Sequence, residues 1–167
     1  MAKSRNAADT LVPVLNHWRE AVPNDRLAHL VKDATRALIR ALQARLAEHG
    51  VPFGHWTYLR ILWTRDGLTQ RELSQEAGVM EPTTVAAVRA MVEAGYVTRR
   101  QTAHNRKNVY VFLTAKGRAL KEKLVPLAEE VNEIAVRGAS SAELAATRGV
   151  LFRVIENLAH DDSGAAG

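Results

Sequence analysis

The spacing of apolar residues changes several times along the chain, and each change indicates a different element. From Asp25 to His49 they recur every three or four residues, which is the spacing of one helix face. These positions are Leu27, Leu30, Val31, Ala34, Leu38, Leu42 and Leu46. Gly50 and Pro52 follow as helix-ending residues. The pattern predicts a long amphipathic helix here, preceded by a shorter helical segment from about Thr10 to Ala21.

The next stretch predicts two short helices on either side of a turn. Residues 53 to 64 place four bulky apolar side chains inward, namely Trp56, Leu59, Leu62 and Trp63. Asp66-Gly67 forms a turn, and Thr69 with Glu72 three residues later has the spacing of a capping box. Leu73 supplies the buried face of the second helix, and Gly78 ends it.

A third helix begins at Pro82 and ends near Gly95, with four residues predicted to face inward: Val85, Val88, Met91 and Val92. Its first turn contains Thr83 and Thr84, although threonine is a mediocre helix former. A helix shaped only for stability would not start this way, so we expect this end to contact something outside the protein.

The period then changes to that of β-structure. Two short strands, Tyr96 to Arg100 and Val109 to Leu113, enclose a polar, basic loop. In the second strand Val109, Val111 and Leu113 alternate with Tyr110 and Phe112, so both faces of this strand should be partly covered. A capped helix, a tight turn, a second helix and a hairpin with a basic tip together predict a winged helix-turn-helix, whose second helix enters the DNA major groove.

The C-terminal part predicts two more helices. Thr114 caps the first, in which Leu120, Leu124, Leu127, Val131 and Ile134 are spaced as in a heptad, with Pro126 expected to bend or loosen it. Ser140 and Glu143 form a second capping box. The last helix then carries five apolar residues that we expect to face inward: Leu144, Leu151, Val154, Ile155 and Leu158.

The expected fold class is mainly α with a small β-hairpin wing, a winged helix-turn-helix with N- and C-terminal dimerisation helices. We expect disordered tails at 1–8 and 161–167. Residues 9–52 form N-terminal helices for dimerisation and a ligand pocket, residues 53–114 form the DNA-binding domain, and residues 115–160 form the C-terminal dimerisation helices.

Charge is distributed unevenly, which favours a nucleic-acid partner. The 167 residues carry a net charge of +5. No acidic residue lies between Glu93 and Glu122, whereas this stretch contains Arg99, Arg100, Arg106, Lys107, Lys116, Arg118 and Lys121. Such a run can be merely a solvated face. Next to a helix-turn-helix, it favours phosphate binding.

Several other functions find no support. The absence of cysteine excludes disulfides, thiolate zinc sites and thiol-based sensing. Enzyme motifs such as a nucleophile elbow or a phosphate-binding glycine loop are missing, so we expect neither an enzyme nor a cofactor. A metal sensor built from His17, His29 and His55 stays a minor alternative. No apolar run is long enough to span a membrane and the N-terminus has no signal core, so we expect a cytoplasmic protein without membrane contact.

The segments "DGLTQRELSQEAGVMEPTTVAAVRAMVEAGYVTRR" and "NRKNVYVFLTAKGRAL" resemble the MarR (multiple-antibiotic-resistance regulator) family. The resemblance runs from about Arg26 to the C-terminal helix. It implies a winged-helix homodimer that binds a pseudo-palindromic operator, usually as a repressor released by a small, often aromatic, anionic ligand. Interlocking terminal helices form the dimer in that family. Two departures concern DNA reading: Asn105 replaces the usual wing Asp, and Ala86 stands where many members have Arg, whereas Arg106 matches the minor-groove arginine.

Two sets of site residues follow from these patterns. The residues expected to bind DNA are Thr69, Gln70, Thr83, Thr84, Ala87, Arg89, Arg99, Arg100, Asn105, Arg106 and Lys107. Those expected to contact an aromatic or carboxylate effector are Arg26, His29, His55, Trp56 and Arg60. A second hypothesis is a helical dimeric ligand- or protein-binding module that uses the winged helix as a protein-interaction surface. The acid-free run argues against it.

Overall fold

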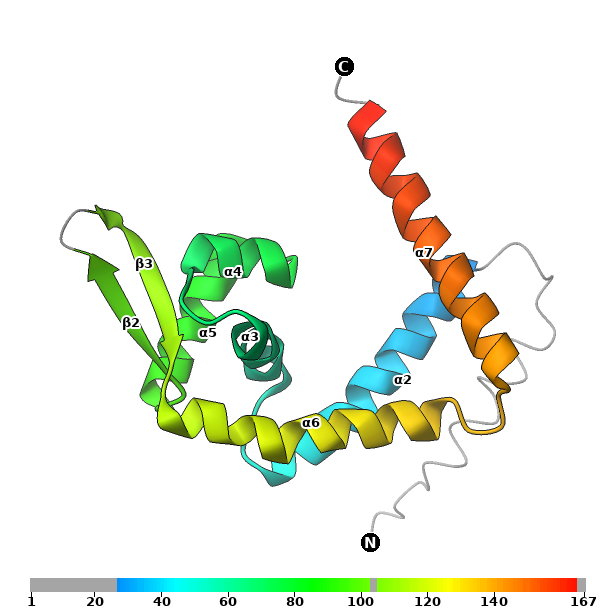
Figure 1. The fold of residues 1–167 in the computed structure, drawn as a ribbon, viewed down its shortest axis with the longest axis horizontal. Coiled ribbons are helices and arrows are strands. Elements are labelled where there is room, and N and C mark those ends of the chain that lie inside the picture. The colour runs from blue at the N-terminus through cyan, green and yellow to red at the C-terminus, as the bar shows by residue number, and fades with distance from the viewer. Residues whose placement is uncertain (1–26, 103–104, 165–167) are drawn as a thin grey trace, which may run out of the picture. The chain divides into compact units, whose positions relative to one another are not determined.

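The computed structural model describes residues 27–102 and 105–164 (Figure 1). The chain divides after Leu127 into two compact units. Six helices and a three-stranded antiparallel sheet make up the described part. The predicted class, mainly α with a small β-hairpin wing, is confirmed. The helix predicted around residues 10 to 21 lies outside the described residues.

The long first helix is confirmed as α2, Leu27–Glu48, and Gly50 follows with φ +67°. Only its C-terminal part enters the core of the unit, through Leu42 and Leu46. The apolar residues nearer its N-terminus are exposed in the single chain: Leu27, Leu30, Val31 and Leu38. An amphipathic helix with a solvated apolar stripe is typical of a surface that another chain covers.

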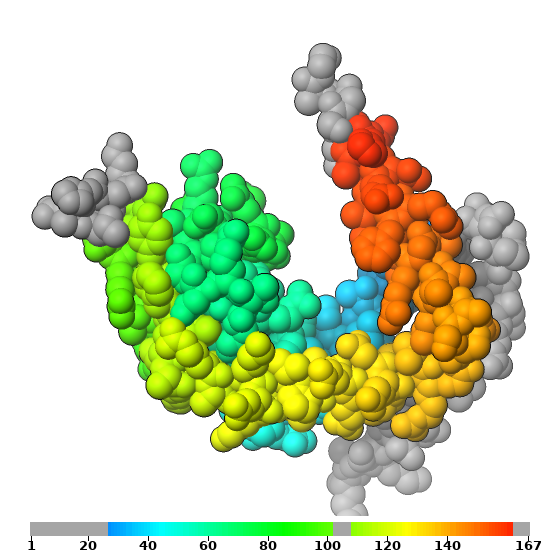
Figure 2. Space-filling model, in the orientation of Figure 1, coloured from blue at the N-terminus to red at the C-terminus, as the bar shows by residue number. Residues whose placement is uncertain are grey.

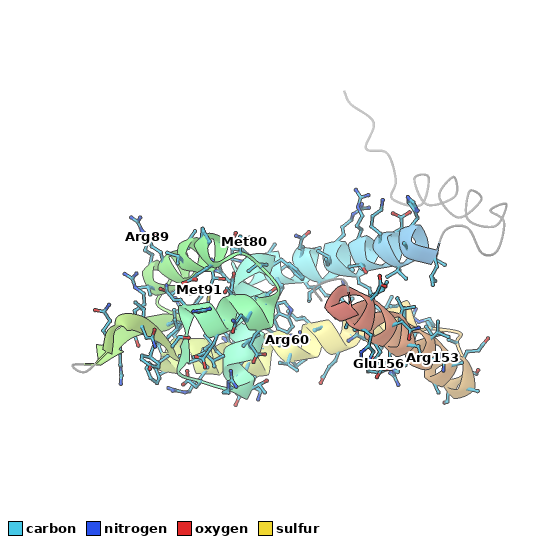
Figure 3. The ribbon with its side chains drawn as sticks, turned by 90° about the horizontal axis from the view of Figure 1, so that it is seen from above. Arg60, Met80, Arg89, Met91, Arg153 and Glu156 are labelled. Carbon is cyan, nitrogen blue, oxygen red and sulfur yellow. The ribbon has the colours of Figure 1, made fainter. Side chains whose placement is uncertain are left out.

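The helices around the predicted turn form as expected. They are α3, Phe53–Thr64, and α4, Gln70–Ala77, and α5 follows at Glu81–Glu93. The helices α3, α4 and α5 pack around a common core. It includes Leu59, Leu62, Leu73, Val88 and Met91, all with at most 1% of their surface exposed. Figure 3 shows Met91 in the interior of this group of helices.

The β-sheet contains one strand that the sequence pattern did not indicate. The two-residue strand β1, Leu68–Thr69, pairs with β3, Asn105–Leu113, which also pairs with β2, Val97–Thr102. The strand order is β1-β3-β2. β2 and β3 are longer than predicted, since polar wing residues show no alternation that would mark them as strand. They form one outer edge of the winged-helix unit (Figure 2).

The last two helices begin at the predicted caps. The helix α6, Ala115–Ala135, starts with the Gly117 N–H donating to Thr114 Oγ1 at 3.0 Å, and it continues through Pro126. The helix α7, Ser141–Gly164, starts at the predicted Ser140–Glu143 box.

The prediction that the apolar residues of α7 face inward is wrong within a single chain for three of the five, whereas Leu144 and Val154 are half-buried. Leu151 is 37% exposed, and Ile155 and Leu158 are at least 60% exposed. The heptad of α6 buries Leu124 and Val131 but leaves Ile134 exposed. Within the described part of one chain, these apolar side chains are therefore left uncovered.

Candidate nucleic-acid interface

The helix-turn-helix is fixed by a reciprocal cap at its start and a glycine at its bend. Glu72 N–H donates to Thr69 Oγ1 at 3.1 Å, and Glu72 Oε2 accepts from the backbone N–H and hydroxyl of Thr69, both at 2.7 Å. These hydrogen bonds from Thr69 lower the pKa of Glu72, because they stabilise its carboxylate form. Gly78 adopts φ +65°, and the chain turns there into α5. The predicted capping box and helix-ending glycine are both confirmed.

The N-terminal turn of α5 is open to solvent. Met80 is the N-cap residue and is 76% exposed, and Glu81, Pro82 and Thr83 are also exposed. No side chain caps this end of the helix, but it offers few free donors, because Pro82 has no N–H and the N–H groups of Thr83 and Thr84 donate to the Met80 carbonyl at 3.0 and 3.3 Å. Figure 3 places Met80 and Arg89 at the outer edge of the unit, away from the buried Met91. Thr83 is therefore available for DNA contact, as predicted.

The prediction that Thr84 contacts DNA is wrong. Its side chain is fully buried, and its Oγ1 lies 3.0 Å from the hydroxyl oxygen of Tyr58 on α3. Val85, predicted to face inward, is instead 40% exposed. The inward stripe of α5 is thus Thr84, Val88 and Met91, and a buried hydrogen bond satisfies the only polar group in it.

The residues at the start of α4 are structural rather than free for DNA. Gln70 was predicted to bind DNA, but it is buried and its Nε2 is enclosed without a hydrogen-bond partner, so that prediction is wrong. Thr69 already donates its hydroxyl proton to Glu72, and a phosphate contact by that hydroxyl would break the capping box. Arg71, which sequence reasoning overlooked, is exposed on the same helix.

Three predicted DNA-binding arginines are exposed. Arg89 Nε lies 3.3 Å from Glu93 Oε1, and both side chains are more than two-thirds exposed, so this pair contributes little stability and can yield to a phosphate. Arg99 and Arg100 are neighbours on β2 and point to opposite faces of the hairpin. The Arg100 guanidinium carbon lies 5.0 Å from the centre of the Phe112 ring, which restricts its orientation.

The predicted residues at the tip of the wing lie at the limit of what the structure describes. The backbones of Asn105, Arg106 and Lys107 belong to β3, but their side chains lie outside the described part. Ala87 is half-buried on α5. DNA contacts by these four residues stay predictions.

Asp66 connects the wing to the helices, although the sequence indicated only a turn at this position. Its Oδ1 accepts from the Leu113 N–H at 2.8 Å and from the Gly67 N–H at 3.0 Å, and its Oδ2 accepts from Arg118 at 2.6 Å. One carboxylate therefore links the turn after α3, the base of β3 and the start of α6. This link attaches the base of the wing to the end of α3 and to α6.

The described residues among those predicted to bind an effector lie in different surroundings. His29 is exposed on α2, and Arg26 lies outside the described residues. His55 is half-buried edge-on to Tyr96, and burial lowers its pKa. Trp56 is buried edge-on to Trp63 in the core. Arg60 instead lines a surface cleft with Ile61, Thr64, Arg65 and Glu76.

The described residues contain neither a cluster suited to a metal ion nor a helix suited to cross a membrane. No group of three or more His, Asp or Glu side chains suited to a metal ion occurs there. None of the described helices is both long and apolar enough to cross a bilayer.

Known proteins resemble this chain in both sequence and fold. Residues 54–109 match the family model described as MarR family. The HTH-type transcriptional regulator TtmR of Methylorubrum extorquens is 29% identical over 101 residues, which cover 60% of this chain and 52% of TtmR. The chain thus spans about half the length of that relative.

Two solved structures extend the likeness. A putative MarR family transcriptional regulator from Listeria monocytogenes, complexed with 26mer DNA, superposes with a TM-score of 0.74 at 25% identity, covering 82% of this chain and 91% of that one. The transcriptional regulator PA3341 gives a TM-score of 0.72 at 29% identity, covering 81% of this chain and 99% of that one.

Proposed function

The chain belongs to the MarR family of transcriptional regulators through its winged helix, and we propose that it represses transcription as a homodimer that binds a pseudo-palindromic operator. A small aromatic or anionic effector releases it from DNA. The prediction that it is not an enzyme is confirmed by its relatives, which are regulators of transcription.

The observation that carries DNA binding is the open first turn of α5 beside a basic hairpin. The exposed Thr83 side chain is available to a groove, while Arg89, Arg99 and Arg100 supply positive charge on α5 and the hairpin. The Listeria relative was crystallised with DNA, which supports the same use of this fold here. Because a transcriptional regulator acts on DNA inside the cell, we propose that the protein is cytoplasmic.

Homodimer formation is supported by the apolar surface that each chain leaves uncovered. One uncovered stretch, on α2, includes Leu27 and Leu30, each 48% exposed, and another, on α7, includes Phe152, Ile155 and Leu158. Patches of this kind on a folded chain mark a protein interface. A symmetric dimer would also present two recognition helices to the two halves of an operator.

The test is a titration of the purified protein against fragments selected from its own genomic DNA, followed by fluorescence anisotropy at several salt concentrations. If Arg89, Arg99, Arg100, Arg106 and Lys107 each contact one phosphate, the slope of log K against log salt is roughly −4 to −5 per protomer. Arg100→Gln should weaken binding and reduce this slope by about 1 per protomer, whereas Arg36→Gln on α2 is a control. Absence of binding at low salt would refute the proposal and favour a protein-interaction module.

A further inference from the structure

We propose that Met80, at the start of the recognition helix α5, recognises the C5-methyl group of a thymine in the major groove of DNA. The side chain belongs to the α4–α5 turn patch, which we define as Val79, Met80 and Pro82. Gly78 ends α4 directly before this patch. The inference names a specificity-determining residue and rests on the proposed function, because it requires that the chain binds DNA through α5.

The α4–α5 turn patch is unusually exposed for apolar side chains. Among the large apolar residues that the structure describes, Met80 has the largest exposed fraction, 76%, and its neighbour Val79 is 40% exposed. Pro82 is exposed as well. Single exposed apolar residues are ordinary on protein surfaces, whereas several together indicate a contact surface. Three such residues within four consecutive positions lie where the helix-turn-helix turns into α5.

The stability of α5 does not explain the methionine. Met80 is the N-cap residue, a position where Ser, Thr, Asp or Asn would bond to the first turn, and no described side chain caps this end. An apolar residue just before the N-cap can instead stabilise a helix by packing on the residue at N4. Here Val79 is 40% exposed, and N4 is Thr84, whose buried hydroxyl pairs with Tyr58. The helix therefore gains neither a polar cap nor a hydrophobic staple from these residues.

The charges around the α4–α5 turn patch favour base edges over phosphates. Glu81 lies between Met80 and Pro82 and is exposed, so its carboxylate repels a phosphate that approaches this turn. Arg89, further along α5, lies on the same outer edge of the unit as Met80 (Figure 3) and supplies the positive charge for phosphates. Base edges in the major groove present amino and methyl groups as well as acceptors. The start of α5 is therefore suited to the floor of the groove.

The thymine methyl is the feature of the groove that a thioether side chain can select. Methionine has no hydrogen-bond donor and its sulfur is only a weak acceptor, so it gains little from the polar edges of bases. Its flexible chain packs well on irregular apolar surfaces. The C5-methyl of thymine is the apolar group that the bases project into the major groove. Removing this methyl group from the contact should weaken binding about fourfold.

The experiment compares thymine with uracil, which differs from it only by lacking the C5-methyl group. The probe is the tightest-binding duplex that the full-length protein selects from a randomised DNA library. Each thymine is replaced by uracil in turn, together with its symmetry-related thymine in the other half-site, and affinity is measured by fluorescence anisotropy. For wild type, we expect one such pair whose replacement weakens binding about sixteenfold, fourfold for each half-site.

The variants assign this loss to one side chain. In Met80→Ala, the same uracil replacement should change affinity by less than about twofold. Met80→Leu should keep most of the sensitivity to uracil, because leucine is also apolar. Arg89→Gln is the matched control, since it should weaken binding to the thymine and uracil duplexes by the same factor. Met80 is exposed, so the thermal unfolding midpoint of Met80→Ala should equal that of wild type.

A second pair of probes separates the methyl group from the rest of the base. Cytosine at the sensitive position lacks the methyl group, and 5-methylcytosine carries it on the same ring carbon. Wild type should bind the 5-methylcytosine duplex more tightly than the cytosine duplex, by about fourfold for each half-site. Met80→Ala should bind the two duplexes equally.

The outcomes distinguish this inference from the proposed function. An equal uracil penalty in wild type and Met80→Ala, or no thymine whose replacement weakens binding, would overturn the inference and leave DNA binding standing. A changed oligomeric state of Met80→Ala with unchanged DNA affinity would also overturn it, and would assign the α4–α5 turn patch to a second copy of the chain. Failure of wild type to bind any duplex at low salt would overturn both.

Discussion

Thr84→Val tests whether Thr84, in the first turn of α5, serves the protein core while its neighbour Thr83 is available to DNA. Valine has nearly the same shape as threonine, so the change removes the hydroxyl group and leaves the Tyr58 hydroxyl without its partner. Tyr58 is only 3% exposed, and water cannot easily replace the 3.0 Å hydrogen bond. An unsatisfied buried hydroxyl costs about 1–3 kcal/mol. We therefore expect the free energy of unfolding to fall by that amount, with DNA affinity unchanged for the folded protein.

The assay is urea unfolding followed by tryptophan fluorescence, at one fixed protein concentration because the proposed dimer would gain stability by mass action. Thr83→Val is the matched control, since the neighbouring hydroxyl is exposed: stability should change by less than about 0.5 kcal/mol, while DNA preference changes. Adding Tyr58→Phe to Thr84→Val should recover much of the lost stability. Normal stability of Thr84→Val combined with weakened DNA binding would refute the assignment of Thr84 to the core.

Three further outcomes are expected from the wing and the capping box. Phe112→Leu should weaken DNA binding by a few-fold, through loss of the ring beneath Arg100, and should have little effect when Arg100→Gln is already present. Asp66→Asn should lower the thermal unfolding midpoint by a few degrees, because the ion pair and two backbone hydrogen bonds at the wing base weaken. The capping carboxylate of Glu72 has a lowered pKa, so its contribution to stability is present above its ordinary pKa of 4.5 and is lost as pH falls through the folded-state value. The free energy of unfolding of Glu72→Gln, measured by acid unfolding, should therefore depend less on pH below 4.5 than that of wild type.

Local signals in the sequence predicted the elements that local interactions determine. The Thr69–Glu72 and Ser140–Glu143 boxes and the turn at Gly78 each depend on residues three or fewer positions apart, and all three occur in the structure. The strand β1 could not be predicted, because two residues show no alternation. It exists only because β3 supplies its hydrogen-bonding partners about 40 residues later.

The errors in the candidate site arise from contacts between distant residues. Helical spacing allows either Thr84 or Val85 to join Val88 and Met91, and hydropathy favours valine. The choice is reversed by Tyr58, whose hydroxyl 26 residues away gives Thr84 a buried partner. The role of Asp66 was missed for the same reason, since Leu113 and Arg118 lie 47 and 52 residues further along the chain.

The burial of Thr84 beside the exposed Thr83 also affects which DNA bases α5 could recognise. With Thr84 inside, the outward face of α5 offers one threonine hydroxyl, at Thr83, followed by Ala86 and Ala87, which have only methyl groups. A thymine methyl can be recognised by such groups, but each bidentate contact that is missing forgoes about 1–3 kcal/mol of discrimination. Contacts from Arg89, Arg99 and Arg100 to phosphates would then supply much of the affinity, and such contacts carry no sequence information. We therefore expect a small ratio of specific to non-specific affinity for one winged helix, so that two half-sites bound by a dimer are needed to select an operator.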